Sequence, residues 1–253
     1  MTILEARRDG PFEIDVFTDI ATVRDDWAAL ESSGECTPFQ TRAWLEPWYE
    51  TVAPHFGAAP LFVRVRERYS GLPLMLLPLV RRRDAGLTLV EFADLGVSDY
   101  HAPLFAPQMG ALGAQASALW SNIQAALRPA DVFRFEKVPA FVGAMRNPLQ
   151  DIARRPMNFS AWDVALPGDR SAFDAALPDP SFLRELARKR RRIEGRGQAR
   201  FAEATTPEDL RRAFAILCAQ RAARFAELGR DNILEGRPFR EFYEKIALAP
   251  RDR

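Results

Sequence analysis

Cysteine and histidine are scarce in this chain, and their scarcity argues against metal chemistry. Two cysteines and two histidines occur among 253 residues. Cys36 and Cys218 lie far apart, with neither a CxxC pair nor another metal-ligand spacing, and only His55 and His101 could join them. We therefore expect no metal site.

Long apolar runs and a large net charge are also missing. The first residues, Met1 to Asp15, hold no apolar stretch long enough for a signal peptide or a membrane span, so we expect a cytoplasmic protein without a transmembrane segment. A formal net charge of +1 provides no overall field toward nucleic acid or an anionic membrane. Any anionic partner must therefore be bound by a local patch.

The composition is that of a folded globular protein, with 47% hydrophobic and 27% charged residues. In the first part of the chain, hydrophobic periodicity predicts mixed strands and helices. A helix start at Thr37-Pro38 is expected to lead into a helix kinked or interrupted by Pro47. The expected strands are 12–17, 61–66, 72–80, 87–92 and 132–135, and the other expected helices are 20–30 and 109–127.

A proline-containing connector, residues 139–156, divides the chain, and we expect domains at 1–158 and 159–253. The second part should contain strands 160–166 and 200–204, an arginine-rich helix 182–194, a helix from Thr206-Pro207 to Gly229, and a last helix near Pro238. These elements supply too few strands for a closed sheet. The second domain is therefore expected to be incomplete.

A polar segment between a predicted strand and a predicted helix is a candidate substrate site. It combines the carboxylate of Asp99, the phenol of Tyr100 and the imidazole of His101. His101 could act as a general base oriented by Asp99, with Tyr100 donating to a sugar or carbonyl oxygen. The alternative is that Asp99 caps a turn and His101 packs in the core. Gln40, at the start of an aromatic-rich helix, is a further candidate for substrate binding.

Cations gather around residue 190 and form a candidate anion site. A diphosphate of coenzyme A, an anionic sugar polymer or nucleic acid could bind there, and the alternative is a solvated basic face. Residues 192–197 fit an R-x-x-G-x-G pyrophosphate spacing, but a helix precedes them where a strand is needed, which favours a helix end. The expected anion-binding residues are Arg188, Lys189, Arg191, Arg192 and, within the apolar stripe of a later helix, Arg221.

Several separated segments together resemble one family, the acetyltransferases of cellulose and exopolysaccharide biosynthesis. This family is related to the GNAT fold and to the Fem-type aminoacyl transferases. The resemblance spans about residues 12–243. Its segments are Trp27 with Leu30, residues 37–40 with Trp44 and Trp48, residues 74–79, residues 94–96 with 98–103, the arginine-rich helix, and residues 218–221.

The resemblance implies an α/β fold, with an N-terminal GNAT-like domain followed by an incomplete second one. It implies transfer of an acyl group from acetyl-CoA or another acyl-CoA to an amine or hydroxyl, such as that of a saccharide. A polysaccharide-synthesis complex is an implied partner. The alternative function is a non-catalytic module that binds an anion or polysaccharide. Nucleic acid is not expected as a partner, because basic and aromatic residues are not interleaved on one surface.

Overall fold

The structure is a computed structural model that describes residues 3–113, 115–152, 155–158, 160, 166–176 and 180–249. Its contacts divide the chain into two compact units. The larger unit combines Met1–Met157 with Arg211–Arg253, and the smaller unit is Asn158–Leu210. Residues 211–253, which lie in the second expected domain, group with the first part of the chain.

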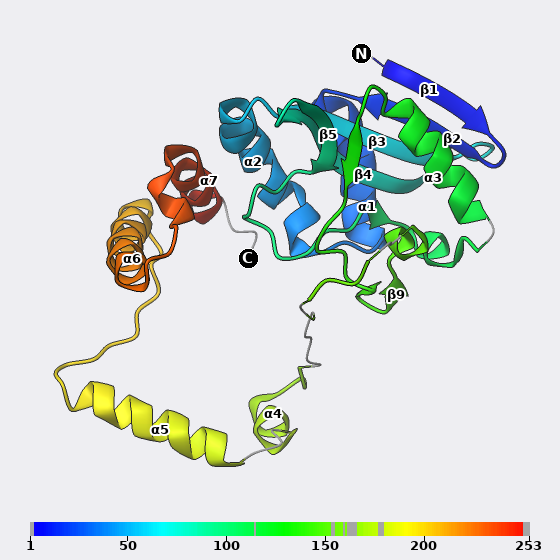
Figure 1. Ribbon diagram of the computed structural model, residues 1–253. Helices are drawn as coiled ribbons and strands as arrows, with labels where there is room; N and C mark the ends of the chain where they lie inside the picture. The colour runs from blue at the N-terminus through cyan, green and yellow to red at the C-terminus, as the bar shows by residue number, and fades with distance from the viewer. Residues whose placement is uncertain are drawn as a thin grey trace. The chain divides into compact units, whose positions relative to one another are not determined.

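A seven-stranded, mostly antiparallel sheet forms the centre of the larger unit (Figure 1). Its order is β1-β2-β3-β4-β5-β7, with β6 pairing to β4. All neighbours are antiparallel except β5 and β7, which are parallel. The strands are β1 (Ile3–Asp9), β2 (Phe12–Phe17), β3 (Ala59–Glu67), β4 (Pro73–Asp84), β5 (Leu87–Phe92), β6 (Leu104–Phe105) and β7 (Val132–Arg134).

Period-two alternation located the main strands correctly. The segment FEIDVF forms β2 over the expected residues, with Ile14 and Val16 in one hydrophobic cluster and Phe17 in the other. The strands expected at 61–66, 72–80 and 87–92 are β3, β4 and β5. β1 was not expected, because ILEARRD lacks regular alternation. It pairs with β2 at the sheet edge through a turn in which Gly10 has a φ of 60°.

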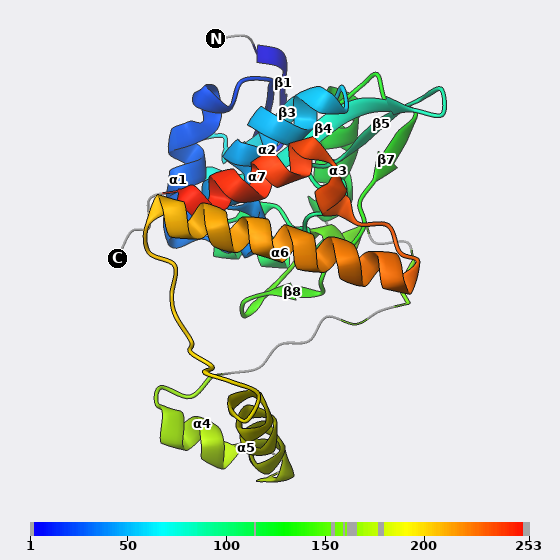
Figure 2. The same ribbon diagram turned by 90° about the vertical axis from the view of Figure 1, so that its left-hand side faces the viewer.

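Helices cover both faces of this sheet, which makes the fold a mixed α/β arrangement. One cluster of buried side chains joins α3 (Gln115–Ala126) to β2, β3 and β4, and the other joins the opposite face to α1 (Arg24–Ser33) and α2 (Arg42–His55). Helix α7 (Arg237–Leu248) packs against α2 (Figure 2). Trp27 and Trp48 are fully buried, so the apolar stripes of α1 and α2 fill the core as their spacing predicts.

The start of α2 differs from the expectation. The Thr37 hydroxyl caps only a short 3-10 turn, η2 (Pro38–Gln40), and Thr41 is extended with a ψ of 153°. The α-helix therefore begins after Thr41. It then continues through Pro47 without interruption. The other short elements of the larger unit are η1 (Ile20–Val23), η3 (Pro107–Ala111), β8 (Phe141–Val142), β9 (Met145–Arg146), η4 (Pro148–Asp151) and η5 (Ile233–Glu235).

The smaller unit contains α4 (Arg170–Ala176) and α5 (Pro180–Glu194), the expected arginine-rich helix. Helix α6 (Pro207–Leu228) confirms the helix expected before Gly229. The strand expected at 200–204 is wrong: these residues have no regular structure, and Phe201 is 98% exposed. A strand needs a paired neighbour for its backbone groups, and none of the described strands pairs there. The strand expected at 160–166 falls mostly on 161–165, outside the described residues.

No helix in the described ranges is long and apolar enough to cross a membrane.

Gly34 provides a test of how tightly α1 packs against β6. Its nitrogen donates to the Leu30 carbonyl, and the next residue exchanges two backbone hydrogen bonds with Phe105. A Cβ at Gly34 would lie 2.6 Å from the Phe105 carbonyl oxygen and 2.8 Å from that of Leu30. We expect Gly34→Ala to lower the free energy of unfolding by about 1–3 kcal/mol, measured by urea denaturation. Gly168→Ala, which meets no atom within 4 Å, is the control. Equal stability of the two variants would contradict this expectation.

Candidate functional site

A cleft opens where the parallel strands β5 and β7 stop pairing. Leu89 pairs with Val132, and the ladder ends with Glu91 opposite Arg134. Beyond this pair the two segments enclose a cleft of about 350 Å³. Crevices beyond the carboxyl ends of parallel strands are common ligand sites, because side chains from both connections converge there. The lining residues are Glu91, Phe92, Asp94, Leu95, Gly96, His101, Arg134, Glu136 and Lys137.

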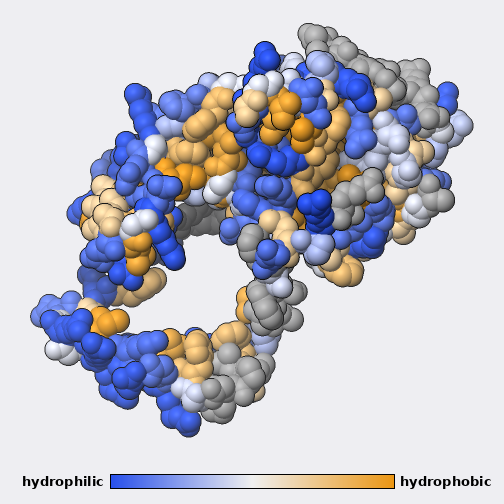
Figure 3. All heavy atoms as spheres, in the orientation of Figure 1, coloured by the Kyte–Doolittle hydropathy of each residue, from blue (hydrophilic) through white to orange (hydrophobic). Residues whose placement is uncertain are grey.

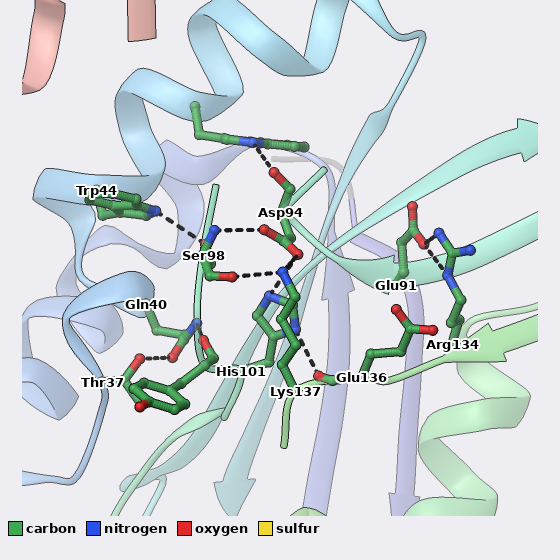
Figure 4. Close-up of polar contacts among 12 residues, drawn as sticks. Thr37, Gln40, Trp44, Glu91, Asp94, Ser98, His101, Arg134, Glu136 and Lys137 are labelled. Carbon is green, nitrogen blue, oxygen red and sulfur yellow. Dashed lines mark hydrogen bonds and ion pairs between the residues drawn. The ribbon is translucent and has the colours of Figure 1, made fainter. Parts of the chain in front are cut away.

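Asp94 organises the connection that follows β5 (Figure 4). Its Oδ1 accepts a hydrogen bond of 2.7 Å from the backbone N–H of Ser98, and its carbonyl accepts one of 2.9 Å from Trp48 Nε1. Leu95 and Gly96, with φ angles of 51° and 94°, make the turn between these anchors. A non-glycine residue in the left-handed region is uncommon, so the turn depends on the hydrogen bonds to Asp94.

Lys137 ties the segment after β7 to this turn. Its ammonium donates to Asp94 Oδ2 at 2.6 Å and to the Ser98 carbonyl at 2.7 Å. Its own carbonyl accepts from the backbone N–H of His101 at 2.9 Å. Lys137 has a φ of 54° and is, after Leu95, a second non-glycine residue in the left-handed region at this cleft. Two connections that are distant in sequence are thereby held together by one ion pair and two main-chain contacts.

His101 is a buried polar residue in the cleft wall, with 4% of its surface exposed. Nδ1 lies 2.9 Å from the Glu136 carbonyl, so this nitrogen carries the proton and donates it. Nε2 has no hydrogen-bond partner, although Asp94 Oδ2 lies 3.4 Å away. Burial lowers the pKa of His101 more strongly than the Asp94 carboxylate raises it. The ring is therefore neutral at pH 7, and Nε2 presents a lone pair.

Phe92 holds the His101 ring in place. The two rings stack with centroids 5.0 Å apart and planes inclined by 17°. With the Nδ1 hydrogen bond, this contact determines the orientation and the tautomer of the imidazole. A neutral imidazole with one nitrogen fixed and the other without a partner has the arrangement of a proton acceptor.

The other expected substrate residues lie beside the cleft and are not among its lining residues. Gln40 is 2% exposed; its Nε2 donates to the Tyr100 carbonyl at 3.1 Å, and its Oε1 accepts from the Thr37 hydroxyl. The Gln40 amide thus positions the backbone next to His101. Asp99 is exposed and Tyr100 is half-buried. The carboxylate beside His101 belongs to Asp94, whereas the sequence analysis considered Asp99 for that position.

The expected anion-binding residues are divided between the two units. Arg221 lies on α6 in the larger unit, where its Nε donates to Asn232 Oδ1 at 3.0 Å and its guanidinium lies 4.2 Å from the centroid of the Phe225 ring. An amide oxygen and an aromatic face thus contact the cation. The remaining expected residues, Arg188, Lys189, Arg191 and Arg192, lie exposed on α5 in the smaller unit.

Sequence reasoning missed Glu136 and Lys137 and gave Asp94 no chemical role. Asp94 lies in one of the segments that carry the family resemblance, residues 94–96, so the sequence could have pointed to it as a site residue. Glu136 and Lys137 follow a short strand without any motif, and only the pairing of β5 with β7 brings them to His101.

The Cys36 thiol is not a reactive nucleophile. Burial, with the charges of Glu31 and Glu35, raises its pKa to about 11, so it stays protonated at neutral pH. Within the described ranges, no group of three or more His, Cys, Asp or Glu residues could hold a metal ion.

Comparisons of the chain with protein-family models, curated proteins and solved structures found no match.

The buried neutral imidazole predicts a pH-dependent stability. The pKa of His101 is below 6.5 in the folded state, so the unfolded chain binds more protons at this residue as the pH falls below about 6.5. The contribution of His101 to the free energy of unfolding is therefore present above about pH 6.5. It is lost as the pH falls from there to the folded-state pKa. We expect His101→Gln to reduce the loss of unfolding free energy between pH 7.5 and pH 5, measured by urea denaturation. Parallel plots of unfolding free energy against pH for the wild type and His101→Gln would contradict this expectation.

The ion pair between Asp94 and Lys137 should be energetically coupled. Their side chains are 13% and 28% exposed, and removing one partner leaves the other charge poorly solvated. We expect Asp94→Asn and Lys137→Met each to destabilise the fold, and the double variant to lose less than the sum. The coupling should be about 0.5–3 kcal/mol in a double-mutant cycle of urea unfolding. Additive losses would show that the pair does not hold the two connections together.

Proposed function

We propose that this protein is an acyltransferase that moves an acetyl or other acyl group from a coenzyme A thioester to an amine or hydroxyl. The acceptor enters the cleft between the ends of β5 and β7. Saccharide precursors of a polysaccharide or of the cell envelope are the acceptors that the resemblance implies. The observation that carries the proposal is the neutral, oriented imidazole of His101, whose Nε2 lacks a hydrogen-bond partner in the wall of the cleft.

The chemistry assigned to His101 is the removal of one proton. The acceptor nitrogen or oxygen attacks the thioester carbonyl carbon, a C–N or C–O bond forms, and the C–S bond breaks. The acceptor proton passes to Nε2 and then to the leaving thiolate, so His101 ends the cycle neutral. The backbone carbonyl of Glu136 accepts from Nδ1–H throughout and stabilises the imidazolium between these steps. A general base of this kind contributes about 10²–10⁴-fold to the rate.

The surroundings of His101 favour this role over simple packing. A core histidine with no ligand usually has both ring nitrogens hydrogen-bonded, because an unpaired buried nitrogen costs free energy. Here one nitrogen is unpaired in a cleft that also contains the Asp94–Lys137 ion pair and the Glu91–Arg134 ion pair. An acceptor N–H or O–H directed at Nε2 would satisfy that nitrogen.

The test measures acetyl-CoA binding by calorimetry and acyl transfer by release of free thiol, with an amino sugar as acceptor. The wild-type protein should bind acetyl-CoA and release thiol only with acceptor present. His101→Gln should lower kcat by about 10²–10⁴-fold while the Kd for acetyl-CoA changes little. The rate of the wild type should fall at low pH, as Nε2 becomes protonated.

Cys36→Ser serves as the matched control, since a protonated thiol has no part in direct transfer. It should retain the wild-type rate. Absence of both acetyl-CoA binding and thiol release in the wild type would overturn the proposal. An unchanged rate in His101→Gln would remove His101 from the mechanism, and loss of activity in Cys36→Ser would indicate a covalent acyl-cysteine route instead.

A further inference from the structure

Helix α5 carries an apolar stripe that is open to solvent. Phe182, Leu186 and Ile193 are spaced by four and seven residues, which places them on one face of the helix. They are 50%, 45% and 61% exposed. Phe201, which follows the helix, is 98% exposed. Helices of soluble proteins normally bury such a stripe, so this one is available for a partner.

The same helix has the largest concentration of positive charge in the sequence. Six cationic and two acidic side chains give α5 a net charge of +4 in a chain whose total is +1. Glu185 pairs with Arg188 and Lys189, and Glu194 pairs with Arg190. These solvent-exposed ion pairs are weak, and they leave α5 with its net positive charge. Blue side chains predominate over this helix in Figure 3, with orange ones between them.

Cations border the apolar stripe rather than lying only opposite to it. On a helical projection Lys189 is adjacent to Phe182, and Arg190 is adjacent to Leu186 on the other side. Long cationic side chains in such positions extend their apolar stems along an apolar surface and keep their charged ends at a polar boundary. The helix therefore suits an environment that is apolar on one side and anionic at its edge.

We propose that α5 binds the surface of an anionic lipid bilayer and lies in the plane of the interface. The apolar stripe inserts between the lipid headgroups, and the cations at its borders contact the phosphates. Amphipathic helices with a polar face rich in lysine and arginine, and clusters of four to eight such residues, bind acidic lipids in this way. With 15 residues the helix extends about 22 Å, shorter than the hydrocarbon core, which agrees with lying on the bilayer.

Lipid fits these observations better than a soluble polyanion. A nucleic acid or an acidic polysaccharide would engage the cations through its charges but would leave three large apolar side chains in water. An anionic bilayer accommodates both kinds of side chain at once. The inference depends on α5 alone and is independent of acyl transfer at the cleft.

The experiment is co-sedimentation of the full chain with vesicles of phosphatidylcholine alone and with vesicles containing equal parts of phosphatidylcholine and phosphatidylglycerol. Binding should occur with the anionic vesicles and weaken with salt. A triple variant without the stripe, Phe182→Ala with Leu186→Ala and Ile193→Ala, should reduce the partition coefficient about tenfold or more. So should a variant that lacks the two bordering cations and a third cation of the same helix, Lys189→Ala with Arg190→Ala and Arg192→Ala.

The control removes three exposed cations elsewhere, through Arg68→Ala, Arg83→Ala and Arg128→Ala, and should bind within about twofold of the wild type, since these residues lie outside the helix. Circular dichroism checks that each variant is folded. Failure of the wild type to bind anionic vesicles overturns the proposal, and so does undiminished binding by the variant without the stripe. Binding of DNA or alginate in the absence of vesicle binding would assign the helix to a soluble polyanion instead.

Discussion

The parallel pairing of β5 with β7 is the constraint on which the cleft depends. Parallel strands need a crossover connection, and here the crossover contains α3, which also covers one face of the sheet. Because both strands run in the same direction, the segments that follow them leave the sheet at the same edge. Asp94 therefore meets Lys137, and His101 meets the Glu136 carbonyl, although these pairs are more than 30 residues apart.

The polar groups around the cleft are held in place by the hydrophobic core. Trp48 is fully buried in α2, and its Nε1 hydrogen-bonds to the Asp94 carbonyl. Gln40 is buried beside α2 and holds the backbone at Tyr100. Such supporting contacts reduce the freedom of the groups they position, and this is what a catalytic arrangement requires. The same burial keeps His101 neutral, so packing determines its protonation state.

The two units offer different kinds of surface. The larger unit has a cleft lined mainly by charged and polar side chains, which suits chemistry on a small molecule. In the smaller unit, α5 exposes apolar and cationic side chains together, which suits attachment to an interface. Neither property follows from the overall composition, since the formal net charge of the chain is close to zero. Local patterns determine both.

Local sequence was sufficient for elements whose side-chain period is regular. FEIDVF alternates and forms β2, the arginine-rich segment forms α5, and the helix before Gly229 ends there, where φ is 59°. The sequence also selected the segment containing His101. It failed at β1, because ILEARRD lacks regular alternation although its partner β2 follows directly. It also failed at residues 200–204, because a strand exists only when another strand satisfies its backbone hydrogen bonds, and none of the described strands pairs there.

Which side chains surround His101 was decided by tertiary structure. From the sequence, Asp99 was the nearest carboxylate to His101, but side chains two residues apart need not face each other. In the fold, the turn at Leu95 and Gly96 directs Asp94 toward the ring, and β7 brings Glu136 and Lys137 to the same place. The sequence thus determined which side chains are available, and strand pairing determined which of them meet, because hydrogen bonds and charges act over a few ångströms of space and not along the chain.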